Sequence, residues 1–188
     1  TKYSTIWLDS LRGGKTELNN TNKLVKSYNG ITGLKTGTTS NAGFCVSATA
    51  SRDGLNLVAV VLGSDTSEHR FDTASYLLDT GFANYSCINI NVDKKKIKPV
   101  KVKNGKEKEV NPIYDRKIKL IITKGSDNLT YKYKIKKEVK APIKKEDKLG
   151  KIEVISNDKK IKSIPLYSDK VVEMVDFNYI FLKIFKHI

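Results

Sequence analysis

The sequence predicts an α+β protein: antiparallel strands with a packed helix, then a small all-β domain, then an amphipathic C-terminal helix. Three observations support this prediction. Residues 30–63 contain three short runs of small, β-branched and apolar residues, separated by Gly, Asn and Asp. Residues 67–82 repeat apolar side chains at helical spacing. From about residue 88, apolar residues alternate with polar ones, most of them lysine.

The N-terminal segment is polar and has weak structural signals. We expect residues 2–12 to be the end of a helix or an extended lead-in, broken at Gly13-Gly14. Residues 16–30, "TELNNTNKLVKSYNG", are Asn-rich and predict an ordered loop with one short turn.

The next segment predicts three antiparallel strands joined by hairpins. The strands are "GITGLKTGT", "AGFCVSATAS" and "LNLVAVVLGS", and the breaks between them are "TSNAG" and "RDGL". A helix follows, with Ser67 as its expected cap and Glu68 in its first turn. Gly81 is the expected stop of this helix. A helix that follows such strands and packs on them forms an α+β unit.

The second half of the chain differs in charge from the first. Residues 1–90 have a balance of +1, and residues 91–188 have a balance of +14. Alternating segments, with turns at Asn104-Gly105, at residues 125–128 and at Asn157-Asp158, predict a small antiparallel sheet or sandwich with one lysine face. The apolar tail, residues 171–188, predicts an amphipathic helix. We therefore expect three parts: residues 1–87, 88–168 and 169–188.

The excess of lysine has two interpretations. It could attract an anionic surface, such as anionic lipid or an anionic wall polymer. It could equally be the solvated surface of a chain rich in Lys, Asn and Ile. Nucleic acid is not an expected partner, because only Tyr131 and Tyr133 come near the interleaving of aromatic and basic residues that a stacking platform needs. Cys45 and Cys87 lack metal-ligand spacing, although a disulfide between them stays open.

The triplet Lys35-Thr36-Gly37 carries the candidate chemistry. On a strand at the edge of an active site, the lysine places a positive charge beside a nucleophile and an anionic substrate group. The threonine hydroxyl can hold a carboxylate oxygen, and the glycine lets a substrate backbone lie against the strand. The N–H of Thr38 could serve as an oxyanion donor.

The surrounding sequence resembles the low-molecular-mass penicillin-binding proteins, the serine-type D-alanyl-D-alanine carboxypeptidases. The matches occur in order, and they are Asn20-Thr21-Asn22-Lys23-Leu24, Gly33-Leu34-Lys35-Thr36-Gly37, Thr39 to Gly43, "AVVLG", Arg70 and "LLDTGF". The resemblance implies the C-terminal part of a penicillin-binding/β-lactamase-like transpeptidase domain. It implies catalytic roles for Lys35, Thr36 and Gly37, and substrate or oxyanion contacts for Thr38, Thr39, Arg70 and Asn22.

Two positions depart from the family pattern, and the family's nucleophile is missing. Several relatives carry arginine where this chain has Thr21, and some carry histidine where it has Thr38, which puts substrate preference in doubt. The family's S-x-x-K and S-x-N elements lie upstream of K-T-G. Here the fits are Ser156 to Lys159, Ser126 to Asn128 and Ser27 to Asn29, which we interpret as ordinary turn or loop residues. We expect the nucleophile to lie in an upstream part of the same protein.

The resemblance implies penicillin-sensitive trimming of the terminal D-Ala from peptidoglycan stem peptides, with β-lactams as inhibitors and no metal or organic cofactor. It also implies a place on the extracytoplasmic face of the bacterial membrane, with the C-terminal helix on an anionic membrane surface. The chain alone is expected to be inactive. The alternatives are a β-lactamase-like hydrolase, or a non-catalytic basic module that binds anionic membrane or cell-wall polymer.

Overall fold

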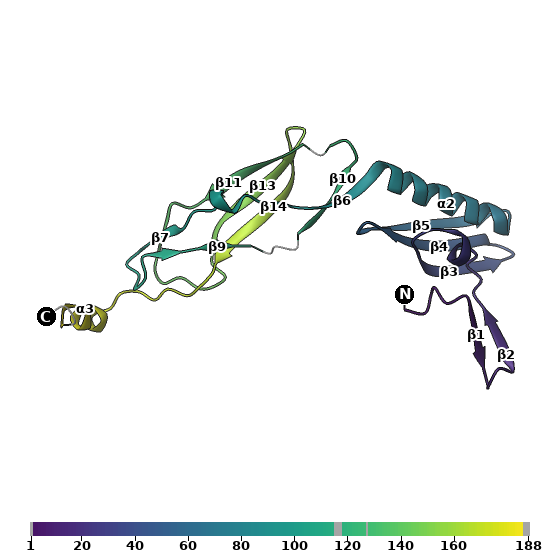
Figure 1. The fold of residues 1–188 in the computed structure, drawn as a ribbon, viewed down its shortest axis with the longest axis horizontal. Helices are drawn as coiled ribbons and strands as arrows, with labels where there is room; N and C mark the ends of the chain where they lie inside the picture. The colour runs from purple at the N-terminus through teal and green to yellow at the C-terminus, as the bar shows by residue number, and fades with distance from the viewer. Residues whose placement is uncertain (1, 115–117, 127, 186–188) are drawn as a thin grey trace. The chain divides into compact units, whose positions relative to one another are not determined.

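The computed structural model describes residues 2–114, 118–126 and 128–185. Residues 183–185 are described by their backbone only. Two compact units divide the chain: residues 1–88 with 120–125, and residues 89–119 with 126–188. The first combines a helix with antiparallel strands and the second is rich in strands, which confirms the α+β prediction. Figure 1 labels the elements of each unit.

The first unit is built on a three-stranded antiparallel sheet with strand order β3-β4-β5. The strands are β3 (Ile31–Thr39), β4 (Gly43–Arg52) and β5 (Leu55–Ser64), which confirms all three predicted strands within one residue. Asp53 and Gly54 both have positive φ, the conformation of a tight two-residue hairpin turn, between β4 and β5. The long helix α2 (Ser67–Asn84) lies along one face of this sheet (Figure 1).

The core of the first unit lies between α2 and the sheet. Small residues of β4 face the helix, so the helix can approach the sheet closely. The buried cluster contains Leu24, Val46, Ala48, Ala50, Leu55, Ala59, Phe71, Ala74, Leu78 and Phe82. This packing positions the first turn of α2 beside the C-terminal half of β3.

Two sequence predictions about α2 were wrong. The cap is Thr66 rather than Ser67, because the Thr66 hydroxyl accepts the His69 N–H at 3.1 Å. The helix does not stop at Gly81 but continues to Asn84. A Cβ at Gly81 would lie 2.6 Å from Cδ1 of Leu57, so this glycine allows the helix to contact the sheet. Close packing, which the sequence does not reveal, explains the glycine better than helix termination.

The N-terminal segment is more regular than predicted. Of the two alternatives for residues 2–12, the extended one fits, because β1 (Leu8–Leu11) is a strand that pairs with β2 (Thr16–Asn19) in an antiparallel ribbon. The ribbon's second strand and a short helix, α1 (Leu24–Ser27), replace the loop expected over residues 16–30. The expected break at Gly13-Gly14 forms the ribbon's turn, where both glycines have positive φ. At the end of this unit β6 (Tyr85–Asn89) pairs with β10 (Lys119–Thr123).

The second unit contains two small sheets. One has the strand order β11-β13-β14-β9, from β11 (Leu129–Ile135), β13 (Lys148–Ser156), β14 (Lys159–Ser168) and β9 (Pro112–Ile113). The other has the order β12-β7-β8, from β12 (Glu138–Lys140), β7 (Val100–Lys103) and β8 (Glu109–Val110). A 3₁₀ turn, η1 (Lys94–Lys96), precedes them. Asn157 and Asp158 have positive φ and form the predicted turn between β13 and β14.

The terminal helix is shorter than predicted. Residues 171–176 are extended rather than helical, because Val172 and Met174 form β-bridges with Ile143 and Gly105. Helix α3 (Phe177–Phe185) begins after them, and residues 186–188 of the predicted helix lie outside the described residues.

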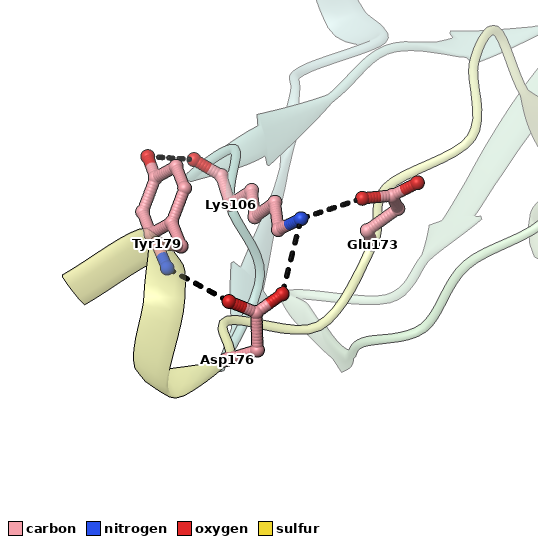
Figure 2. Close-up of polar contacts among 4 residues, drawn as sticks. All are labelled: Lys106, Glu173, Asp176 and Tyr179. Atoms are coloured by element: carbon pink, nitrogen blue, oxygen red, sulfur yellow. Dashed lines mark hydrogen bonds and ion pairs between the residues drawn. The ribbon is translucent and has the colours of Figure 1, made fainter. Parts of the chain in front are cut away.

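Polar contacts attach the start of α3 to the turn between β7 and β8 (Figure 2). The Lys106 ammonium lies 2.7 Å from the Glu173 carboxylate and 3.3 Å from that of Asp176. The Asp176 carboxylate also accepts the Tyr179 N–H at 2.8 Å, and the Tyr179 hydroxyl donates to the Lys106 carbonyl at 3.0 Å. Hydrogen bonds to the Tyr179 N–H and to Lys106 lower the pKa of Asp176. These contacts fix where the helix begins.

Candidate active-site wall

The K-T-G triplet lies in the middle of β3, at the edge of the sheet. Among the described residues β3 pairs only with β4, so no strand occupies its second edge, and the Ser4 hydroxyl donates to the Thr32 carbonyl near the start of the strand at 2.7 Å. Side chains alternate along a strand, so Thr36 and Thr38 share one face while Lys35 and Gly37 share the other. Thr36 lies opposite Val46, a member of the core beneath α2.

Lys35 and Thr36 are held differently. The Lys35 side chain is exposed, and its ammonium donates to the Thr36 carbonyl at 2.8 Å. Thr36 is buried, and its hydroxyl lies 2.6 Å from the hydroxyl of Thr21. The triplet therefore presents an exposed cation beside a hydroxyl whose orientation a second residue restricts. Gly37 has open space above it: no heavy atom lies within 4 Å of the position a Cβ would take.

Arg70, in the first turn of α2, connects this helix to β3. Its Nη1 donates to the carbonyls of Gly37 and Cys45 at 3.3 and 3.2 Å, and to the Thr38 hydroxyl at 3.2 Å. Its Nη2 donates to the Ser67 hydroxyl at 3.0 Å. The side chain is buried against the ring of Phe71. Asp65, just before α2, contacts His69 rather than Arg70, at 2.6 Å, and this contact raises the His69 pKa and lowers that of Asp65.

The remaining two candidates, Thr39 and Asn22, form hydrogen bonds within the turns next to β3 and α1. The Thr39 hydroxyl accepts the Ala42 N–H at 3.0 Å, so it stabilises the turn after β3. Asn22 is buried and its side-chain oxygen accepts the Leu24 N–H at 3.2 Å, while its side-chain nitrogen has no acceptor among the described residues. Among the described residues Asn22 makes no hydrogen bond to β3; its neighbour Thr21 makes that contact. Cys45 and Cys87 are both free thiols.

The structure brings together Lys35, Thr36, Gly37, Thr38 and Arg70, and adds Thr21 to them. Sequence reasoning treated Thr21 only as a departure from a pattern, because residues fifteen positions apart give no signal of contact. Of the three serine patterns, Ser27 ends α1 and Ser156 ends β13, where its buried hydroxyl donates to the Ser126 carbonyl at 3.2 Å. Asp127, in the third pattern, lies outside the described residues.

Comparison with known proteins agrees with this arrangement. Residues 1–66 match the family described as D-alanyl-D-alanine carboxypeptidase, and residues 85–174 match "Penicillin-binding protein 5, C-terminal domain". The chain belongs to the D-alanyl-D-alanine carboxypeptidase family of low-molecular-mass penicillin-binding proteins. Its first unit corresponds to the end of the carboxypeptidase domain, and its second to the β-rich domain that follows in this family.

Individual carboxypeptidases of this family match most of this chain, but the match covers only about half of their own length. The chain is 30% identical to D-alanyl-D-alanine carboxypeptidase DacF of Bacillus subtilis over 182 residues, which cover 94% of this chain and 47% of that protein. It is 30% identical to DacD of Escherichia coli, covering 81% of this chain and 40% of the relative. Penicillin binding protein 5 of Haemophilus influenzae superposes with a TM-score of 0.76 at 27% identity, covering 92% and 51% of the two chains. The chain thus spans about half the length of these carboxypeptidases.

Proposed function

We propose that this chain supplies one wall of the active site of a serine-type D-alanyl-D-alanine carboxypeptidase, and that the serine nucleophile lies in an upstream part of the same protein. The observation that carries the proposal is the open edge of β3, where the exposed Lys35 ammonium and the Thr36 hydroxyl flank the bare backbone at Gly37. An extended peptide with a terminal carboxylate fits such an edge: the strand binds its backbone and the cation binds its carboxylate.

The proposed reaction divides between the two parts of the protein. The upstream serine attacks the carbonyl between the two D-alanines of a peptidoglycan stem peptide, and the C–N bond breaks. D-Alanine leaves with a proton, an acyl-enzyme ester remains, and water then releases the trimmed peptide. Lys35 and Thr36 hold the terminal carboxylate, and the Thr38 N–H stabilises the oxyanion. β-Lactams acylate the same serine.

Labelling with a fluorescent penicillin tests this proposal. The 188-residue chain alone is expected to stay unlabelled on a denaturing gel, because its serines in S-x-x-K or S-x-N patterns lie in a helix end and in strand ends or turns. A longer protein that includes the upstream sequence is expected to bind about one label per molecule. Stoichiometric labelling of the chain alone would overturn the division of the site, and Ser27→Ala and Ser156→Ala variants would then locate the nucleophile.

The reaction class needs its own measurement. A carboxypeptidase releases D-alanine from a D-Ala-D-Ala peptide and hydrolyses its β-lactam ester slowly, whereas a β-lactamase-like hydrolase turns over the lactam rapidly. We expect the longer protein to release D-alanine. Rapid lactam turnover without D-alanine release would favour the hydrolase.

A second role, at an anionic membrane surface, is favoured by α3. Large apolar side chains recur on this helix and are about half exposed or more, namely Phe177, Ile180, Phe181 and Leu182. An amphipathic helix of this kind binds at the bilayer interface rather than across it. No helix within the described residues is long and apolar enough to span a bilayer.

Flotation with liposomes tests the membrane role. We expect truncation before Phe177 to abolish binding to anionic vesicles without disturbing the strand bridges of residues 172–174. A Phe177→Ser, Phe181→Ser variant should lose binding in the same way. Undiminished flotation of both variants would refute this role for α3, and equal binding to neutral and anionic vesicles would remove its electrostatic part.

A further inference from the structure

The second unit contains a basic groove that the active-site wall does not use. Its volume is about 520 Å³, and five lysines line it, which are Lys96, Lys98, Lys101, Lys136 and Lys137. Tyr133, Ile135 and Pro99 also line it, and Glu109 is its one acidic residue. Tyr133 and Ile135 are half-buried, whereas the five lysines are exposed, so the groove has an apolar base and a cationic rim.

The charges of the rim are mostly uncompensated. Among the described residues, none of the five lysines forms an ion pair, although lysines elsewhere in the unit do. Lys101 lies in register between Glu109 and Glu138, although the Glu138 carboxylate pairs with Lys103. Lys98, Lys136 and Lys137 lie outside the strands, in the segments before β7 and between β11 and β12. Ammonium groups that converge on a concave, partly apolar surface raise its positive potential, and an anion that enters it relieves their repulsion.

Tyr133 adds a neutral donor at the base of the groove. Its hydroxyl accepts the Asp93 N–H at 3.2 Å, which leaves its own proton for a ligand. Burial raises the pKa of this phenol, so it stays protonated. The Lys96 ammonium lies 5.9 Å from the centre of the Tyr133 ring.

We propose that this groove binds a linear, phosphodiester-linked anionic polymer with a polyol or sugar body, of the kind found in a cell wall. Phosphates contact the lysines of the rim, while the polyol body lies on Tyr133 and Ile135. The choice of a wall polymer rests on the proposed function at the wall, whereas the preference for a polyanion rests on the groove alone.

The shape of the groove distinguishes the polymer from other polyanions. A planar bilayer presents its headgroups to the rim of a concave site but does not reach the base, whereas a thin flexible chain fills it. A single-stranded nucleic acid gains most from stacking on several aromatic rings, and this groove offers only Tyr133.

The test measures binding of a fluorescent glycerol-phosphate oligomer to the whole 188-residue chain by anisotropy. We expect the Lys98→Gln, Lys136→Gln, Lys137→Gln variant to bind about tenfold or more weakly, since each lysine near a polyanion contributes a substantial electrostatic share. The matched control is Lys159→Gln, Lys160→Gln, Lys162→Gln, which removes the same charge from exposed positions on β14 of the same unit. It should change affinity by less than about threefold, because these lysines lie outside the groove.

Equal weakening in the two variants, or undiminished binding in the groove variant, would overturn the proposal. Equal competition by single-stranded DNA of the same charge, or by inorganic phosphate at matched ionic strength, would also overturn it. Anionic vesicles that bind more tightly and depend on the same three lysines would assign the groove to the membrane instead. None of these readouts involves penicillin acylation. A failure here therefore leaves the proposed active-site wall untouched, and the converse also holds.

Discussion

The guanidinium of Arg70 lies 3.2 Å from the hydroxyl of Thr38, and this contact joins the first turn of α2 to the edge strand β3. Arg70 is buried without an ion pair to any described carboxylate, and hydroxyl and carbonyl oxygens accept its hydrogen bonds. The rigid core of helix and sheet thus supports the strand that carries the K-T-G triplet.

We predict that Arg70→Met destabilises the first unit by about 2 to 3 kcal/mol, because partly buried acceptors on β3 and β4 lose their donor. Urea unfolding followed by circular dichroism measures this change. The control is His69→Ala at the neighbouring exposed position, which should cost less than about 1 kcal/mol. An unchanged urea midpoint in Arg70→Met would show that these hydrogen bonds are dispensable.

Gly37→Ala should separate stability from function. Nothing lies within 4 Å of the added Cβ, so the urea midpoint should be unchanged or slightly raised. In the longer protein the same methyl group would meet a substrate backbone and slow acylation by labelled penicillin about tenfold to a hundredfold. Acylation at the normal rate would place the substrate away from this glycine.

Thr21→Val should slow acylation in the longer protein without reducing the final amount of label. The variant removes the 2.6 Å contact that orients the Thr36 hydroxyl. One hydrogen bond of about 1 kcal/mol corresponds to about a fivefold change in rate. Thr21→Ser keeps the hydroxyl and should restore the rate; if serine fails to do so, Thr21 acts through its methyl group or not at all.

Gly105→Ala should destabilise the second unit by about 1 to 3 kcal/mol. The added Cβ would lie 2.7 Å from Cγ1 of Val102, 2.8 Å from Cγ1 of Val172 and 2.9 Å from the Glu107 carbonyl oxygen. Valine side chains have little rotamer freedom, so the neighbours cannot simply turn away. Thermal unfolding measures the change, and a melting temperature equal to that of the parent chain would contradict it.

Glu153 should make the second unit sensitive to acid. Its carboxylate lies 2.8 Å from the ammonium groups of both Lys134 and Lys151, and these contacts lower its pKa from 4.5 to about 2. A depressed carboxyl pKa adds stability above the unfolded value of 4.5, and this stability disappears as the pH falls toward 2.

The variant Glu153→Gln isolates this effect. The parent chain should be more stable than Glu153→Gln near neutral pH, and the two urea midpoints should converge as the pH falls from 4.5 to about 2. A difference that stays constant over this range would mean that the ionisation of Glu153 does not stabilise the unit.

The sequence by itself determined the local features of this protein. Runs of small, β-branched and apolar residues predicted the three strands of the first unit, and alternation of apolar and polar residues predicted the strands of the second. The Asp-Gly and Asn-Asp pairs predicted turns between strands. The order of motifs from Asn20 to Phe82 identified the family. These features depend on neighbours in the chain, so they can be read along it.

Tertiary structure alone decided what distant residues do. Gly81 looked like a helix stop, yet it lies within α2 because the helix packs closely on Leu57. Residues 171–176 looked helical, yet they are extended because Val172 and Met174 pair with other segments. Thr21 meets Thr36, and Arg70 meets Thr38, only because the chain folds back on itself. Packing and pairing between segments far apart in sequence outweigh local propensity, and no local pattern records them.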